Sequence, residues 1–272
     1  MLEVRIKPEL VQYELVQGDK LTIMHRLQPI ALTTATTQSV SLLPELEAVI
    51  FDLDGVITDT AEYHFLAWKQ LADELGLPFN REINERLKGV SRSDSLAIIL
   101  EQGNLALTEE EKQTLTTRKN EHYKTMIEAM TPEQMLPNIR ELLQALKQSG
   151  LKLAIASASE NAPKVLERLE IIDMFDAVVN PRSARKGKPD PELFLLASEM
   201  LGIYPTHCLG VEDSFAGITA IKDARMPAIG IGDSSVLSEA DYVVKDTEQL
   251  SVAVIQDVFR RVHKRTPAPT TN

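Results

Sequence analysis

The chain has 272 residues and a formal net charge of −11, and 43% of its residues are hydrophobic. This length allows more than one domain, and the composition is that of a globular protein with a sizeable core. The acidic balance argues against nucleic acid or an anionic membrane as a partner, because both are bound through Lys and Arg. Cys208 is the only cysteine, which excludes an intramolecular disulfide and a cysteine-based metal site and fits a cytoplasmic location. We find no apolar run of about 18 residues and no signal-like N-terminal stretch, so we expect no membrane span.

Residues 1–32 differ in pattern from the rest of the chain. Short segments of alternating apolar and polar residues, with a turn at Gly18, predict two or three antiparallel strands that form a β-ribbon. A ribbon of this size is marginally stable alone and would have to pack on another surface. Residues 33–46 begin with a stretch rich in Thr and Ser and are predicted to form a linker, and residues 263–272 are predicted to form a frayed tail.

From residue 47 onward, strand and helix patterns alternate. The predicted strands cover residues 48–51, 151–156, 177–179, 207–211, 228–231 and 242–244. This alternation predicts an α/β fold with a doubly wound, mainly parallel sheet. Residues 62–133 contain helix patterns only, among them a long helix with an N-terminal cap at Thr108. We therefore expect a core made of residues 47–61 and 134–262, with residues 62–133 inserted as an all-helical cap domain.

Two carboxylates, Asp52 and Asp54, follow the first predicted strand directly and precede Gly55. Ligands of parallel sheets bind beyond the carboxyl ends of the strands, and side chains two residues apart point the same way. Both acids can therefore face one phosphate and one divalent cation, an arrangement suited to phosphoryl transfer in which one acid attacks and the other carries a proton. The alternative is an ordinary Asp-Gly hairpin turn, but a helix pattern rather than a second strand begins at Glu62.

Polar residues also follow two later strands. Ser157 and Ser159 come after the strand 151–156 and would offer hydroxyl and backbone N–H groups, although such a pair before a helix is often a simple N-cap. Glu212 and Asp213 come after the strand 207–211 and carry the oxygen ligands that Mg²⁺ prefers. We expect all four side chains at the same edge of the sheet as the first two acids.

Lys188 precedes a predicted helix that Asp190 caps, a place where anions collect. The alternative for any such lysine is a solvated surface position. We expect that position for the neighbouring basic residues, Arg182, Arg185 and Lys186.

The segment 51–60 resembles the first motif of the haloacid dehalogenase superfamily of phosphotransferases, and its continuation to Trp68 resembles the β-phosphoglucomutase family. The resemblance runs from about residue 47 to about residue 260. It implies that Asp52 is the nucleophile, which forms an aspartyl-phosphate, and that Asp54 is the general acid and base. It also implies that Ser157 holds the transferring phosphoryl group and that Lys188 neutralises Asp52 and the phosphoryl oxygens.

The resemblance further implies one Mg²⁺ per subunit. We assign this ion to Asp52, the backbone carbonyl of Asp54, and Asp213, with Glu212 as a further ligand or a group behind the ligands.

The substrate-binding residues implied by the resemblance lie in the cap and in the loop after the second core strand: His64, Trp68, Gly89, Val90, Arg92, Ser95, Lys119, Ala158, Ser159 and Asn161. Arg92 would grip the phosphate that is not transferred, since a guanidinium fork suits phosphate, and Lys119 would reach a sugar hydroxyl or Asp54. The alternative for His64 and Trp68 is a helix face packed on the core. Glu160 stands where the family commonly has a basic residue, so an inward-facing Glu160 would repel the distal phosphate.

The implied reaction is the Mg²⁺-dependent interconversion of β-D-glucose 1-phosphate and glucose 6-phosphate, with glucose 1,6-bisphosphate as intermediate and activator. The alternatives are a sugar-phosphate phosphatase of the same superfamily and a catalytically inactive adaptor, against which the intact Asp-x-Asp pattern argues. Residues 1–32 resemble the C-terminal β-segment of family-65-type glycoside phosphorylases, or else form an unrelated accessory hairpin. A glycoside phosphorylase is therefore a candidate partner, and we expect a monomer.

Overall fold

The computed structural model describes residues 44–87, 90–103 and 105–265. The predicted ribbon and most of the predicted linker lie outside these residues. All six predicted strands are present, with ends shifted by one residue at most: β1 (Ala48–Phe51), β2 (Lys152–Ile155), β3 (Ala177–Val178), β4 (Cys208–Glu212), β5 (Ala228–Ile231) and β6 (Tyr242–Val244).

The helices of the described residues fall into two groups along the chain. Four follow β1 and precede α5: α1 (Ala61–Glu74), α2 (Arg81–Glu85), α3 (Arg92–Glu101) and α4 (Glu109–Ile127). The others lead into β2 or connect or follow later strands: α5 (Ile139–Gln148), α6 (Ala162–Arg168), α7 (Glu192–Leu201), α8 (Phe215–Asp223) and α9 (Val252–Arg265). Short 3-10 helices occur at η2 (Pro132–Gln134), η3 (Ile172–Met174), η4 (Pro181–Ser183), η5 (Pro205–His207) and η6 (Thr247–Gln249). Helix α9 includes the first three residues of the predicted tail, 263–265. No helix in the described part of the chain is long and apolar enough to cross a membrane.

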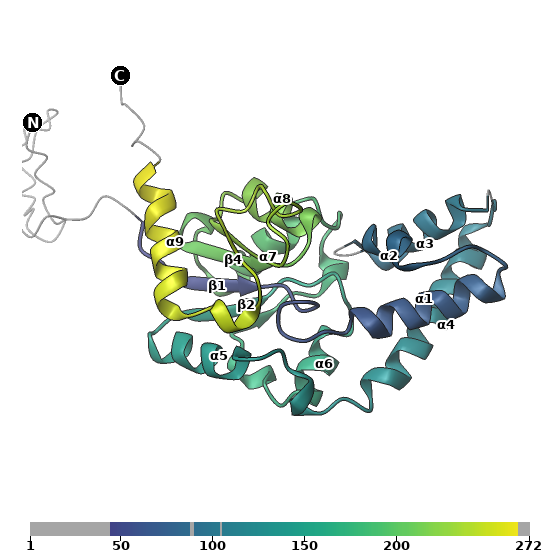
Figure 1. Cartoon of the computed structure of the whole chain (residues 1–272), viewed down its shortest axis with the longest axis horizontal. Coiled ribbons are helices and arrows are strands. Elements are labelled where there is room, and N and C mark those ends of the chain that lie inside the picture. Colours follow the sequence, from purple (N-terminus) through teal and green to yellow (C-terminus); the bar gives the residue numbers. More distant parts are fainter. Residues whose placement is uncertain (1–43, 88–89, 104, 266–272) are drawn as a thin grey trace, which may run out of the picture. The chain divides into compact units, whose positions relative to one another are not determined.

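The sheet is parallel throughout, with the strand order β3-β2-β1-β4-β5-β6. The chain builds outward from β1 through β2 to β3 and then crosses to β4 on the other side of β1 (Figure 1). Ile50 of β1 is in register with Ala154 of β2 and Gly210 of β4. In sheets of this topology, ligands bind outside the carboxyl ends of the strands where the order reverses, which here is between β1 and β4. The predicted doubly wound parallel fold is confirmed.

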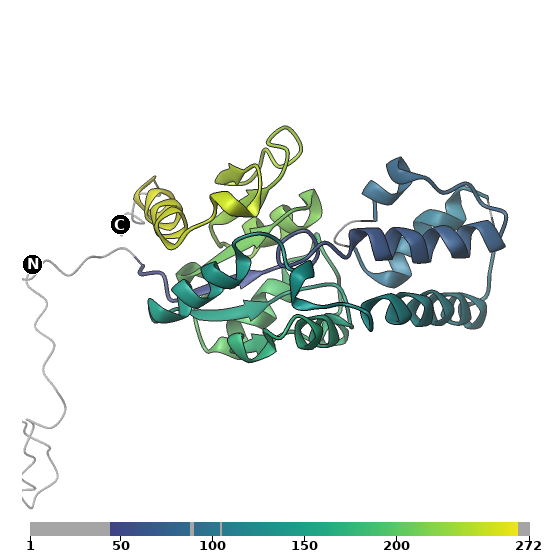
Figure 2. The ribbon, with the colours of Figure 1, turned by 60° about the horizontal axis from the view of Figure 1, so that its bottom comes forward.

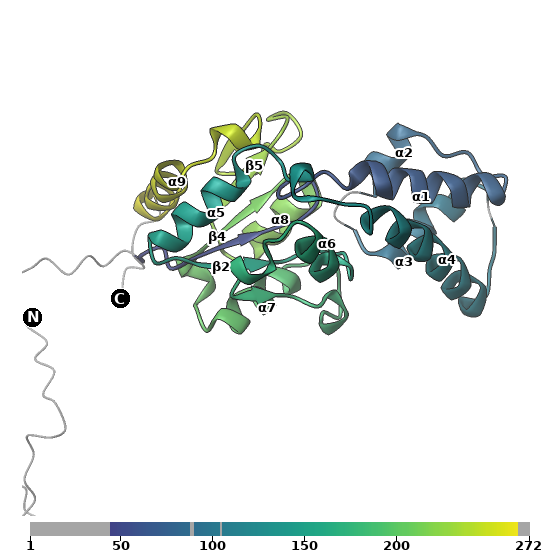
Figure 3. The same ribbon diagram turned by 90° about the horizontal axis from the view of Figure 1, so that it is seen from below.

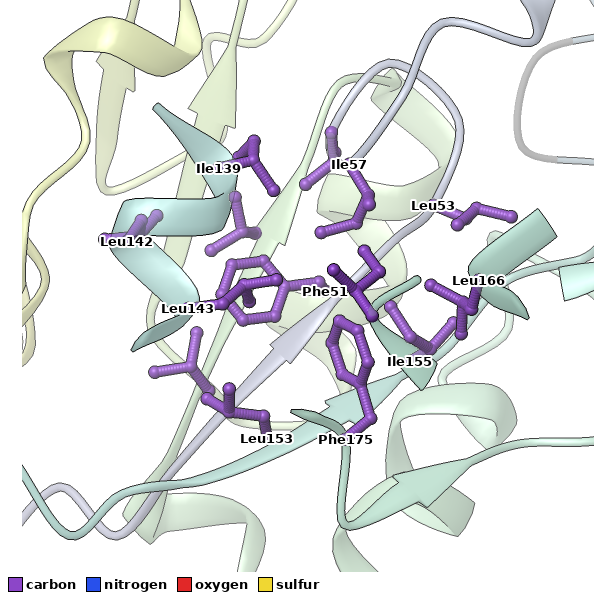
Figure 4. Packing of buried hydrophobic residues seen from close by; sticks show 14 of the residues in the cluster. Phe51, Leu53, Ile57, Ile139, Leu142, Leu143, Leu153, Ile155, Leu166 and Phe175 are labelled. Carbon is purple, nitrogen blue, oxygen red and sulfur yellow. The ribbon is translucent and has the colours of Figure 1, made fainter. Parts of the chain in front are cut away.

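Helices cover both faces of the sheet (Figure 2). Val49 and Phe51 belong to a buried cluster with α5, α6 and α9, whereas Ala48 and Ile50 belong to a second cluster with α7 and α8. Figure 4 shows the Phe51 ring among side chains of α5, β2 and α6. Burial on both faces explains why β1 is apolar at every position, and each large side chain buried in this way contributes about 1.5–3 kcal/mol.

Helices α1 and α3 and the loops beside them form a third apolar cluster, made of Trp68, Leu71, Ala72, Leu77, Phe79, Leu87, Leu96, Ile99 and Leu100. Tyr123 and Ile127 of α4 instead belong to the cluster that contains Val49 and Phe51. Helix α4 begins with the predicted cap, in which the Thr108 hydroxyl accepts the Glu111 N–H and the Glu111 carboxylate accepts the Thr108 N–H. Figures 1 and 3 show the four helices beyond the carboxyl end of β1. We propose that they form the cap of the site at this end of the sheet.

Candidate active site

A buried lysine joins the ends of the two central strands. Asp52 follows β1 and Glu212 ends β4, so the parallel register brings both carboxylates to one sheet edge. The Lys188 Nζ atom, from the loop before α7, lies 2.6 Å from Asp52 Oδ1 and 2.7 Å from Glu212 Oε2, and the lysine side chain has 0% exposure. Burial alone would lower the pKa of Lys188, but the two carboxylates more than offset this effect and raise it. The lysine therefore stays charged beside Asp52.

Glu212 is held from both sides. Its Oε1 atom accepts the N–H groups of Asp213 and Ser214 at 3.1 Å and the Ser214 hydroxyl at 2.9 Å, while Oε2 faces Lys188. Because both oxygens are engaged with protein donors, the geometry favours a role in positioning Lys188 over direct ligation of a cation.

The acids at this edge fit a divalent cation. Oxygen atoms of Asp52, Glu212 and Asp213 lie within 4.8 Å of one another, and the Oδ1 atom of Asp54 is buried without a hydrogen-bond partner. Gly55 has φ +79° and donates its N–H to the Thr58 carbonyl, so the chain turns tightly here and leaves the carboxylates grouped. Carboxylate and carbonyl oxygens are the ligands that Mg²⁺ takes, so the residues present suit this ion.

Asp54 lies in surroundings that favour its protonated form. Burial, followed by the charge of Asp52, raises its pKa to about 8. His64 Nε2 is 3.9 Å from Asp54 Oδ2, and His64 Nδ1 is 2.8 Å from Lys119 Nζ, so Lys119 contacts His64. Burial also lowers the pKa of Lys119 to about 7. A carboxyl group that titrates near neutral pH can both give and take a proton, which suits a general acid and base.

A cavity of about 400 Å³ lies between the sheet edge and the helices α1 to α4. Most predicted site residues line it: Asp52, Asp54, His64, Trp68, Val90, Arg92, Ser95, Lys119, Ser157, Ala158, Ser159 and Asp213. Trp68 also belongs to the apolar cluster around α1 and α3, so the packing expected of this helix face is present, and its role in binding substrate stays a prediction. The volume is sufficient for a phosphorylated sugar.

Three other described site residues are not in this lining. Lys188 and Glu212 form the buried ion pair with Asp52, and the Asn161 side-chain amide donates to Asn120 Oδ1 of α4 at 2.8 Å. Gly89 lies outside the described residues.

The prediction that Arg182 is a solvated surface residue is wrong in part. Its side chain is 69% exposed, yet it lines the cavity and donates a 2.9 Å hydrogen bond to Glu160 Oε2. Its neighbours Arg185 and Lys186 are exposed and pair with Glu192 and Asp190, as expected for surface residues. Other lining residues that the sequence did not single out are Ala61, Asn84, Leu87, Ser91, Ser93, Gln113, Thr116 and Pro181. An acid at position 160, where the family commonly has a basic residue, was the available signal for a nearby cation.

Comparison with known proteins agrees with this geometry. A family model described as haloacid dehalogenase-like hydrolase matches residues 46–225, which places the chain in the haloacid dehalogenase superfamily. The β-phosphoglucomutase of Bacillus subtilis (strain 168) is 49% identical over 226 residues, which cover 82% of this chain and 100% of that protein. The crystal structure of β-phosphoglucomutase from Clostridium difficile matches with a TM-score of 0.79 at 42% identity. The match covers 81% of this chain and 100% of that chain. Within the superfamily, the chain belongs to the β-phosphoglucomutase family.

A second relative has a different activity in its name. The phosphorylated carbohydrates phosphatase of Thermotoga maritima is 33% identical over 217 residues, which cover 76% of this chain and 98% of that protein.

Proposed function

We propose that the chain interconverts β-D-glucose 1-phosphate and glucose 6-phosphate through glucose 1,6-bisphosphate. The observation that carries this proposal is a single cavity lined both by Asp52, which is paired with Lys188, and by the cap residue Arg92. A sugar with a phosphate at each end needs both groups, one to exchange the phosphoryl group and one to hold the other phosphate. A phosphatase needs only the first. Membership of the β-phosphoglucomutase family supports glucose as the sugar.

The reaction uses the two aspartates in different roles. The 6-hydroxyl oxygen of β-glucose 1-phosphate attacks the phosphorus on Asp52, the bond from phosphorus to the Asp52 oxygen breaks, and Asp54 takes the hydroxyl proton. The bisphosphate then turns round in the cavity. An Asp52 oxygen attacks the phosphorus at position 1, the bond from phosphorus to the sugar oxygen breaks, and Asp54 returns the proton to that oxygen.

The surrounding groups stabilise the charge that develops. Lys188 lies beside Asp52, and Ser157 accepts the Ser159 N–H at 3.0 Å through its oxygen, which leaves its hydroxyl proton for a phosphoryl oxygen. Asp52, Asp213 and the backbone carbonyl of Asp54 would hold Mg²⁺, which offsets negative charge on the phosphoryl oxygens when it is bound.

Water must be kept from the aspartyl-phosphate, or hydrolysis replaces transfer. Helix α4 contacts the core through Asn120 with Asn161 and through the Tyr123 hydroxyl with Thr60. These contacts support a role for the cap in closing the site.

We further propose that the chain works as a monomer in the cytoplasm and that a glycoside phosphorylase supplies its substrate. Light scattering of the purified chain tests whether it is a monomer. Co-purification with such a phosphorylase tests whether the two proteins associate.

The central test is incubation with β-glucose 1-phosphate, Mg²⁺ and a trace of glucose 1,6-bisphosphate. Glucose 6-phosphate is the expected product, and its formation should depend on the bisphosphate. Release of inorganic phosphate without glucose 6-phosphate would instead establish a phosphatase, the activity named for the Thermotoga maritima relative. The Asp52→Asn variant should lose both activities, which makes it the control for contaminating enzymes.

A further inference from the structure

Two arginines meet one carboxylate on the wall of the cavity. Glu160 Oε2 lies 2.9 Å from a terminal nitrogen of Arg182 and 3.7 Å from one of Arg92. The three residues come from separate segments: Arg92 begins α3 in the cap, Glu160 lies between β2 and α6, and Arg182 is in η4. All three line the same cavity as Asp52, but they pair with one another, whereas Asp52 pairs with Lys188.

The charge of this cluster suits a phosphate. Two guanidinium groups and one carboxylate leave a net charge of +1, and each guanidinium has five N–H donors, more than Glu160 can accept. A sugar phosphate carries a charge of about −2 near pH 7, which is opposite in sign and similar in size to the charge of two guanidinium groups. The third basic residue in the described lining, Lys119, faces His64 instead.

Glu160 holds the two guanidinium groups together in the absence of substrate. Its hydrogen bond from Arg182 is the main cause that lowers the Glu160 pKa, so the carboxylate is ionised at neutral pH. Arg92 is more buried than Arg182, with side-chain exposures of 22% and 69%. Without the carboxylate, the two like charges would repel each other, and the more exposed Arg182 would swing into solvent.

We propose that Arg182 acts with Arg92 to bind the phosphate that is not transferred, and that Glu160 is a positioning residue for both. The inference rests on the proposed function, since only a substrate with a second phosphate uses this site. It also reverses the expectation that Glu160 repels the distal phosphate, because here the carboxylate keeps a second cation in place.

Direct binding tests the inference without turnover. In full-length chains that also carry Asp52→Asn, isothermal titration calorimetry with glucose 1,6-bisphosphate and Mg²⁺ should show that Arg182→Ala raises the Kd about tenfold or more, the loss of one charged hydrogen-bonding partner. The matched control is Arg185→Ala, which removes an exposed arginine three residues away that pairs with Glu192. A Kd for Arg182→Ala within about twofold of this control would overturn the inference.

Glu160→Ala separates positioning from repulsion by the sign of its effect. If Glu160 positions the arginines, its loss should raise the Kd for the bisphosphate although a negative charge has been removed. If it merely repels phosphate, the Kd should fall, and the positioning role would be wrong. Adding Glu160→Lys to Arg182→Ala should restore affinity, because a cation again stands beside Arg92.

A third measurement distinguishes failure of this inference from failure of the proposed function. Acetyl phosphate carries one phosphoryl group and has no second phosphate to bind. The extent to which it phosphorylates Asp52, measured by intact-protein mass spectrometry, should therefore be equal in the wild-type and Arg182→Ala chains. Loss of this reaction in Arg182→Ala would mean that the substitution disturbs the catalytic centre, and the proposed role of Arg182 would be wrong. The proposed function fails on a different observation, the absence of glucose 6-phosphate from the wild-type assay.

Discussion

Gly55 faces the carboxylate of Asp213 so closely that no side chain fits between them. A methyl group at position 55 would overlap Asp213 Oδ2, and Gly55 has φ +79°, a conformation that favours glycine. The turn that ends the Asp52-to-Asp54 segment therefore also limits the position of an acid that follows a different strand, β4.

We expect Gly55→Ala to displace Asp213 and to weaken Mg²⁺ binding by about 10- to 100-fold, the usual effect of disturbing the groups that orient a ligand. Titration of activity with Mg²⁺ measures this effect. Gly150→Ala is the matched control, because Gly150 has φ +80° and nothing within 4 Å of its added methyl group. Both variants should lose about 1–2 kcal/mol of stability from the backbone conformation. Equal Mg²⁺ affinity in the two variants would contradict the assignment of Asp213.

The second prediction concerns the buried ion pairs. Lys188→Met leaves Asp52 and Glu212 buried without their shared cation and should lower the free energy of unfolding by about 3–5 kcal/mol at neutral pH. Urea unfolding measures the loss, with the exposed Lys186→Met as control. Adding Glu212→Gln should recover part of it, since one of the unpaired charges is then gone. A loss no larger than that of Lys186→Met would argue against a stabilising role for the two ion pairs of Lys188.

The third prediction follows from the raised pKa of Asp54 in metal-free protein. The pKa moves from 3.8 to about 8, mainly through burial, so the folded protein keeps a proton that the unfolded chain releases above pH 3.8. Stability from this group is fully present below pH 3.8 and falls as the pH rises to about 8, by up to about 1.4 kcal/mol per pH unit. Asp54→Asn removes this dependence. In EDTA, the free energy of unfolding of the variant should therefore increase relative to that of the wild type as the pH rises from 5 to 8. Parallel stability profiles across that interval would show that Asp54 ionises normally.

The fourth prediction separates the two phosphate sites. Arg92→Ala should reduce kcat/KM for β-glucose 1-phosphate by about 10- to 100-fold through the loss of charged hydrogen bonds, but should barely change hydrolysis of p-nitrophenyl phosphate, which has one phosphate. Arg86→Ala offers a control, because this exposed arginine pairs with Glu101 and is not part of the described cavity lining. Equal losses with both substrates would point to a structural role for Arg92.

Much of the fold could be predicted because buried parallel strands leave a simple pattern. The run from Ala48 to Phe51 is apolar at each position, since helices cover both of its faces, and Asp52 marks its end. Once the strand ends are known, the parallel register brings Asp52 and Asp213 to one edge of the sheet. The grouping of these acids therefore followed from local patterns and topology.

Contacts that depend on the path of a loop could not be predicted in this way. Arg182 is 22 residues from Glu160, and no periodicity relates η4 to the cavity that it reaches. The role of Glu212 likewise depends on side-chain orientation, because the same carboxylate could have faced a cation instead of Lys188 and Ser214. Sequence patterns locate such groups at an edge, but their partners are set by packing in three dimensions.

The separate apolar cluster around α1 and α3 has an evolutionary consequence. Trp68 of α1 belongs to this cluster, and α3, which Arg92 begins, packs in it through Leu96, Ile99 and Leu100, so both are supported apart from the two clusters that pack against the sheet. Mutations that reshape the sugar-facing wall need not disturb the strand ends that hold the reacting acids. New substrate preferences can therefore arise by divergence of the insertion alone, while the ancestral chemistry is inherited unchanged.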